Sequence, residues 1–82
     1  MGQQEVLSLL ETYPRLCTKE IAQFLGKEEW KISKILNKLK KNREISIKNP
    51  DDEELERILS KFPTAEFGIK NGLLKVYEVK DE

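Results

Sequence analysis

The clearest indication of the fold of this chain is residues 16–45, LCTKEIAQFLGKEEWKISKILNKLKKNREI. Apolar side chains recur at helical spacing on both sides of Gly26, which predicts two helices joined by a turn. We expect Thr18 to cap the first helix and Glu20 to suit the positive end of its dipole. The second helix is expected from about Lys27 or Glu28 to Lys41. Inward positions of the two helices are Ile21, Ala22, Leu25, Ile32, Ile35, Leu36 and Leu39.

Two further elements are expected on either side of this stretch. Residues 3–13 carry apolar side chains at positions 6, 9, 10 and 13, one face of a helix that Pro14 ends. After the pair of helices, Ile45 and Ile47 alternate with polar residues, which predicts a short, half-buried strand.

The rest of the chain predicts one more helix and a hairpin. Asn49 as cap and Pro50 at the first position predict a helix over residues 50–62, with an apolar stripe that we expect to serve the core rather than a dimer contact. Asn71-Gly72 favours a two-residue type I′ turn, which would pair Phe67 with Val76 in a C-terminal β-hairpin. The expected fold class is therefore α+β, mainly α.

Composition limits the possible functions. Eighty-two residues form one domain, 1–82, with 15 basic and 15 acidic side chains and no histidine. Residues 27–48 hold eight basic and three acidic residues, a net charge of +5, whereas residues 51–56 hold five acids and no base. A basic segment of this kind is typical of nucleic-acid binding. The single cysteine, Cys17, is expected to be a buried apolar side chain, which suits a reducing cytoplasm.

Several classes of function are not expected. A chain with one Cys and no His offers neither a zinc site nor a Cys/His nucleophile, and neither a phosphate loop nor a nucleophile–base pair is evident. We therefore expect no enzyme activity, no cofactor, no metal and no small-molecule substrate. The absence of a long apolar run also argues against a membrane partner.

The pattern of helices, Gly26 turn and following strand resembles the winged helix-turn-helix DNA-binding superfamily. Ile21, Ala22, Gly26 and the apolar row of the second helix of the pair carry the resemblance, which covers about residues 3–48. It implies a three-helix core, a third helix that enters the major groove of duplex DNA, and a C-terminal hairpin that acts as the wing. The helix over residues 50–62 departs from the family pattern, because wing strands usually follow the third helix directly. The resemblance also leaves a homodimer open.

The resemblance assigns candidate DNA contacts to the outward side of the third helix and its surroundings. Lysines there would supply affinity through phosphates, while Ser33 and Asn37 would read base edges. Trp30 is expected to pack in the core rather than lie on the DNA backbone. The candidate nucleic-acid-binding residues are Lys27, Lys31, Ser33, Lys34, Asn37, Lys38, Lys41, Arg43, Lys70 and Lys75.

A transcription regulator that binds double-stranded DNA is the favoured interpretation of this sequence. The alternative is a protein-interaction winged helix within a larger complex, favoured by the neutral net charge and the presence of only three arginines. RNA binding is a further alternative, although the aromatic side chains that stack on single strands are scarce. Ion pairing discriminates between these hypotheses, since Lys31, Lys34 and Lys38 bonded to acids of the same chain would weaken the DNA interpretation.

Overall fold

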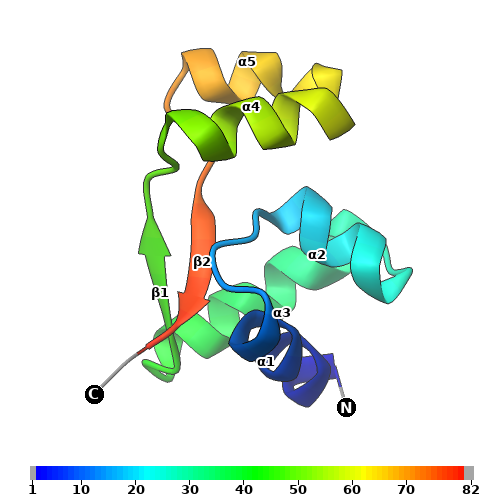
Figure 1. Ribbon diagram of the computed structural model, residues 1–82. Helices are drawn as coiled ribbons and strands as arrows, with labels where there is room; N and C mark the ends of the chain where they lie inside the picture. Colours follow the sequence, from blue (N-terminus) through cyan, green and yellow to red (C-terminus); the bar gives the residue numbers. More distant parts are fainter. Residues whose placement is uncertain (1, 81–82) are drawn as a thin grey trace.

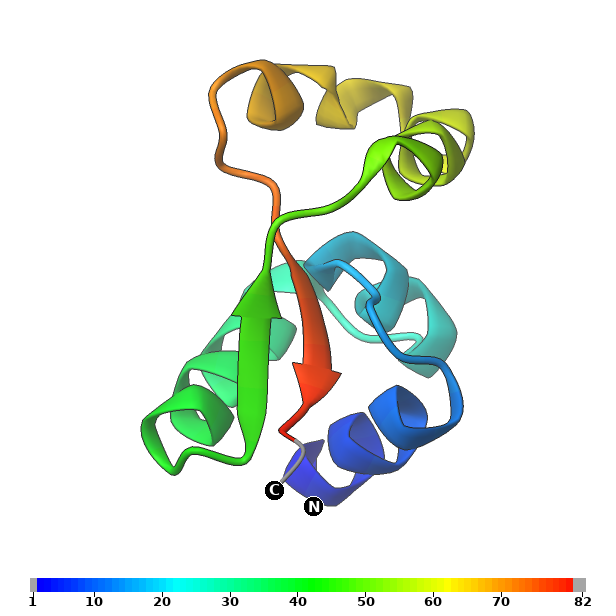
Figure 2. The same cartoon turned by 60° about the vertical axis from the view of Figure 1, so that its left-hand side comes forward.

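The computed structural model describes residues 2–80 and shows a mainly helical α+β fold with one small sheet (Figure 1). The expected fold class is thereby confirmed. The helices of residues 52–70 lie beyond one end of the two-stranded sheet, and the helices of residues 2–41 lie beside it (Figures 1 and 2). In chain order the elements are α1 (Gly2–Thr12), α2 (Thr18–Leu25), α3 (Glu29–Lys41), β1 (Ile45–Lys48), α4 (Asp52–Lys61), the 3₁₀ helix η1 (Pro63–Ala65), α5 (Glu66–Lys70) and β2 (Val76–Val79).

The larger core lies among the first three helices and β1. The apolar positions expected to face inward on α2 and α3 supply most of it, with Leu25 and Ile35 at its margin. Tyr13 was expected on the inward face of α1 but is 50% exposed, because it lies beyond the last turn and stacks on Phe24. The buried members of this core are Val6, Leu10, Leu16, Ile21, Ala22, Ile32, Leu36, Leu39 and Ile45.

The turn between α2 and α3 forms as the sequence predicted. Gly26 has a φ of 63°, and the backbone N–H of Lys27 donates to Ala22 O at 3.0 Å, which closes the end of α2. The start of α2 differs by one residue, since Cys17 occupies the cap position and Thr18 lies within the first turn. The backbone N–H of Cys17 donates to the Glu20 carboxylate at 3.1 Å, so the side chain that closes this end of the helix is Glu20 and not Thr18.

The predicted C-terminal hairpin is wrong. Residues 66–70 form α5, and Asn71-Gly72 ends that helix, with Gly72 at a φ of 67°. A helix C-terminus needs a positive φ as much as a type I′ turn does, so the same dipeptide satisfies both. The pair of Phe67 with Val76 is therefore not formed. Instead β2 pairs antiparallel with β1 in the register Ile45↔Val79, Ser46↔Glu78, Ile47↔Tyr77 and Lys48↔Val76.

Residues 49–75 are consequently an insertion between the two strands of one antiparallel pair (Figure 2). Helix α4 begins after Asp51, whose carboxylate accepts from the Glu54 N–H at 2.8 Å, so Asp51 and not Asn49 is the cap. The apolar stripe of α4 serves a second small core, as expected. This core contains Cys17, Ile58, Ala65 and Val76, with Phe62 and Leu74 packed against it.

Candidate nucleic-acid interface

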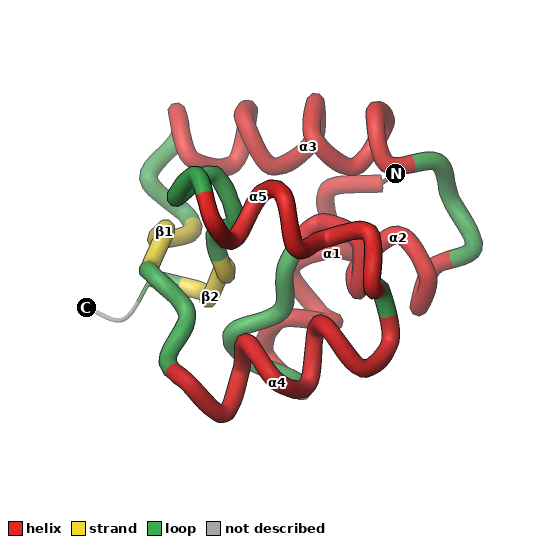
Figure 3. The backbone as a smooth tube through the Cα atoms, turned by 90° about the horizontal axis from the view of Figure 1, so that it is seen from above, coloured by secondary structure: helices red, strands yellow, loops and turns green. Residues whose placement is uncertain are grey.

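Burial of one side of α3 determines which of its side chains reach solvent. Ile32, Leu36 and Leu39 are at most 2% exposed and hold the helix against α1, α2 and β1. Viewed from above, α3 runs along one edge of the molecule and α4 along the opposite edge (Figure 3). The free side of α3 is therefore an outer surface, and the acidic start of α4 lies on the other side of the domain.

Four lysines form a row on this free side. Lys31, Lys34, Lys38 and Lys41, here called the lysine row, follow one another at intervals of three, four and three residues and are all exposed. Side chains three or four residues apart on a helix are neighbours, so the four ammonium groups share one strip of surface. Lys31 lies 3.4 Å from Glu28, whereas Lys34, Lys38 and Lys41 have no ion pair within residues 2–80.

Ser33 and Asn37 flank the lysine row and are exposed, one helical turn apart. They lie where short polar side chains could reach base edges if α3 entered a groove. Lys27 precedes α3 in the turn, and its ammonium lies 3.7 Å from the Glu5 carboxylate. Lys27 is thus the candidate lysine that is partly neutralised from another helix.

Arg43 lies just past α3 in an unusual backbone conformation. Its φ of 61° is the left-handed region that a helix end often requires, and glycine usually fills it. The N–H groups of Arg43 and Glu44 donate to Lys40 O and Leu39 O at 3.0 and 2.9 Å. An arginine at this strained position leaves an exposed guanidinium at the end of the lysine row.

Trp30 does not pack in the core, so that expectation is wrong. The indole of Trp30, the second residue of α3, is 55% exposed, because Ile32, two residues further on, takes the inward position and residues two apart on a helix do not share a face. The ammonium groups of Lys31 and Lys34 lie 5.5 and 5.3 Å from its ring centroid, within the range of cation–π attraction. An exposed indole is therefore part of the candidate interface.

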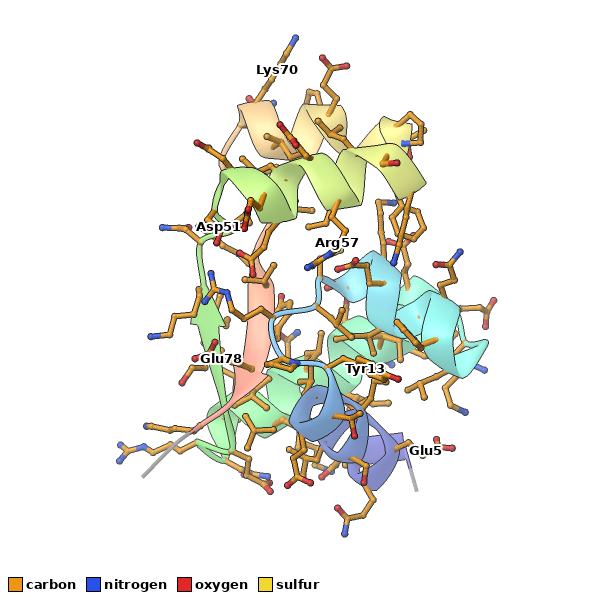
Figure 4. All side chains as sticks on the ribbon, in the orientation of Figure 1. Glu5, Tyr13, Asp51, Arg57, Lys70 and Glu78 are labelled. Carbon is orange, nitrogen blue, oxygen red and sulfur yellow. The ribbon has the colours of Figure 1, made fainter. Side chains whose placement is uncertain are left out.

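The structure does not bring Lys70 and Lys75 onto the free side of α3. Lys70 is on α5 and points away from the body of the molecule (Figure 4), with its ammonium 3.5 Å from Glu66. Lys75 precedes β2 and donates to the Asn49 side chain across the base of the insertion. Both were candidates because a hairpin was expected, and that hairpin is not formed.

A buried ion pair that no pattern in the sequence predicted joins the insertion to α2. Glu20 is 0% exposed, and both of its carboxylate oxygens accept from the Arg57 guanidinium at 2.9 Å. Lys61 lies 3.7 Å from the same carboxylate. Arg57 extends from α4 toward α2 and the loop before it (Figure 4). In the sequence, the position of Glu20 in the first turn of a helix already explained an acid there. Nothing indicated that its carboxylate would be buried against an arginine.

A second cluster fixes the base of the insertion. Arg15 donates to both oxygens of Glu54 at 2.6 and 2.9 Å and to Glu78 at 3.3 Å. The hydrogen bonds from Arg15 hold the pKa of Glu54 below its ordinary value of 4.5, and the same bonds raise the pKa of Arg15. Similarly, the hydrogen bond to Glu20 raises the pKa of Arg57. The carboxylates neutralise the two guanidiniums, so neither Arg15 nor Arg57 is available to an external anion.

No other type of site stands out in the described chain. Residues 2–80 contain no cluster of three or more acidic or cysteine side chains suited to a metal ion. None of the helices formed by these residues is long and apolar enough to cross a bilayer. The chain matches no protein-family profile, no curated protein sequence and no solved structure.

Proposed function

We propose that this domain is a winged helix-turn-helix module that binds double-stranded DNA through α3 and serves in transcription regulation. In this proposal α2, the Gly26 turn and α3 are the helix-turn-helix, and β1 and β2 are the wing strands. The helices of residues 49–75 form an insertion at the tip of the wing. The element order and the antiparallel pairing of β1 with β2 support this assignment.

The observation that carries the proposal is that three of the four members of the lysine row have no acidic partner within residues 2–80. The chain has as many acids as bases, yet three consecutive members of the row find no carboxylate within residues 2–80. Elsewhere in the described chain, Glu54, Glu29 and Glu20 are each paired with a basic side chain from another element. A strip of unpaired ammonium groups on one exposed helix is complementary to a phosphate backbone.

The position of the acidic residues also supports a duplex that binds on the α3 side of the domain. Five acids cluster between residues 51 and 56 at the start of α4, on the edge of the molecule opposite α3 (Figure 3). A duplex that lies along α3 therefore keeps away from them. The net charge of zero is thus compatible with a polyanion-binding surface on one side of the domain.

Salt-dependent binding to duplex DNA tests the proposal. We expect a labelled random-sequence duplex to bind at low salt, with a log–log slope of affinity against salt of about −4 for four neutralised phosphates. Changing Lys34 and Lys38 together to Gln should reduce the slope by about two. The variant with Lys70 and Lys75 changed to Gln alters the net charge equally and should bind like the wild type. Absence of binding at low salt, or equal losses in both variants, would refute the proposal.

One observation favours the protein-interaction alternative. Phe67 and Leu73, on and beside α5, are 71% and 67% exposed, the most exposed large apolar side chains within residues 2–80. Apolar side chains at the tip of an insertion suit contact with a partner protein. If this alternative holds and DNA binding is absent, changing both residues to Ser should abolish capture of the partner without lowering stability. Stability of the variant would be followed by thermal unfolding.

A further inference from the structure

Trp30, the single tryptophan of the chain, is the exposed large apolar side chain of α3. A domain of this size has few large apolar side chains, yet its largest stays 55% exposed instead of joining either core. Tryptophan side chains left at a surface are enriched at binding sites. The exposed indole is therefore available to contact a duplex bound along α3.

Trp30 lies among the residues that would face DNA. Trp30, Lys34, Asn37 and Lys41 follow at intervals of four, three and four residues, which places them in one line along the helix. Ile32, Leu36 and Leu39 occupy the buried side. Trp30 is also in the first turn of α3, and the first turns of recognition helices are the part that contacts base edges.

The two lysine ammonium groups over the ring are available to phosphates. Lys34 has no acid partner within residues 2–80, and Lys31 has only an exposed carboxylate one turn away. A phosphate attracts an ammonium more strongly than an exposed indole does, because the charge on the phosphate is a full unit. Binding of a duplex therefore transfers these groups to the backbone and uncovers the ring against the floor of the groove.

The floor of the major groove offers one apolar group, the C5-methyl of thymine. The other base edges there present hydrogen-bond donors and acceptors, which an indole face would leave unpaired. We propose that Trp30 contacts this methyl group and gives the domain a preference for thymine at the position that α3 reaches. The inference rests on the DNA-binding function proposed above and assigns to that site a specificity-determining residue.

The test removes only the methyl group. Alternating adenine–thymine duplexes present thymine in every register, and replacing thymine by deoxyuridine leaves all base-pair hydrogen bonds unchanged. The wild type should bind the thymine duplex at least about fourfold more tightly, the factor expected for one buried methyl group. Affinities would be measured by anisotropy of the labelled duplex at one low salt concentration, and the indole fluorescence of Trp30 should change on the same titration.

Two variants complete the comparison. Trp30→Ala should bind the thymine and deoxyuridine duplexes equally, whereas Phe67→Ala, which removes an exposed aromatic ring from the insertion, should keep the wild-type ratio. Any effect of the methyl on duplex shape persists in Trp30→Ala and is thereby separated from a contact. Circular dichroism verifies that each variant is folded.

The outcomes distinguish this inference from the proposed function. Equal wild-type affinities for the two duplexes, or an unchanged ratio in Trp30→Ala, would refute the thymine contact while salt-dependent binding still supports the function. Failure of the wild type to bind either duplex at low salt would overturn both proposals.

Discussion

Replacing Arg57 with Met should destabilise this domain more than neutralising Glu20, although both changes break the same ion pair. Arg57→Met leaves the Glu20 carboxylate at 0% exposure with only Lys61, at 3.7 Å, and the Cys17 N–H, at 3.1 Å. A buried charge that has lost its partner typically costs about 3–5 kcal/mol of folding free energy. Because the free energy of unfolding of such a domain is about 4–12 kcal/mol, the loss is a large fraction of the total.

Glu20→Gln should cost less, about 2 kcal/mol, because it leaves no buried charge. The amide oxygen of Gln can still accept from the Cys17 N–H, and the Arg57 side chain, 36% exposed, can turn to water. Neutralising Glu20 should therefore restore part of the stability that Arg57→Met removes. Adding Glu20→Gln to the Arg57→Met chain removes the stranded carboxylate, so the double variant should be more stable than Arg57→Met alone.

Urea denaturation followed by circular dichroism measures these differences. At about 1 kcal/mol per M of urea, Arg57→Met should lower the midpoint by about 3 M or remove the native baseline. Lys70→Met breaks an exposed pair with Glu66 and serves as control, with an expected cost under about 0.5 kcal/mol. The reasoning fails if Arg57→Met unfolds within about 0.5 M of the wild type, or if the double variant is no more stable than Arg57→Met.

Arg43→Gly should stabilise the domain by about 0.5–1 kcal/mol, because Arg43 has a φ of 61°, and should reduce the salt slope of DNA binding by about one; a loss of stability in denaturation experiments would contradict this. Since Arg15 lowers the pKa of Glu54, the stability that this pair contributes is complete above about pH 4.5 and is lost as the pH falls below it. The destabilisation of Glu54→Gln should therefore be largest near pH 7 and shrink toward about pH 3, and a constant difference would contradict it. Burial at 0% exposure raises the pKa of Cys17, so alkylation by iodoacetamide should be at least about 100-fold slower in the native protein than in urea; equal rates would show that the thiol is accessible.

Much of the candidate interface could be predicted from the sequence because it depends on one helix. The spacing of Ile32, Leu36 and Leu39 determines the buried side of α3, and the lysine row then lies on the free side by helical geometry alone. The absence of acids between residues 31 and 43 is likewise visible in the chain. The same geometry places Trp30 in line with Lys34 and Asn37, and the expectation of core packing was wrong because it rested on the size of the indole and not on its position on the helix.

The insertion could be predicted only in part. A helix near residues 50–62 follows from its cap and apolar stripe, and the structure has α4 at Asp52–Lys61. The contacts of that helix could not be predicted, since Glu20 and Arg57 are 37 residues apart in the chain. Likewise Arg15 reaches Glu54 across 39 residues. No local pattern indicates which acid will be buried beside which arginine.

Elements whose causes are local follow directly from the amino-acid sequence. Helical periodicity, Gly26 at the turn and the alternation at Ile45 and Ile47 act within a few residues, so α2, α3 and β1 form where these signals predict. The partner of β2 depends on contacts between distant parts of the chain. Asn71-Gly72 supplies positive φ to either a hairpin or a helix end, and only the pairing of β2 with the distant β1 selects between them. Strand pairing and burial depend on what lies across the fold, and residues close in sequence do not contain that information.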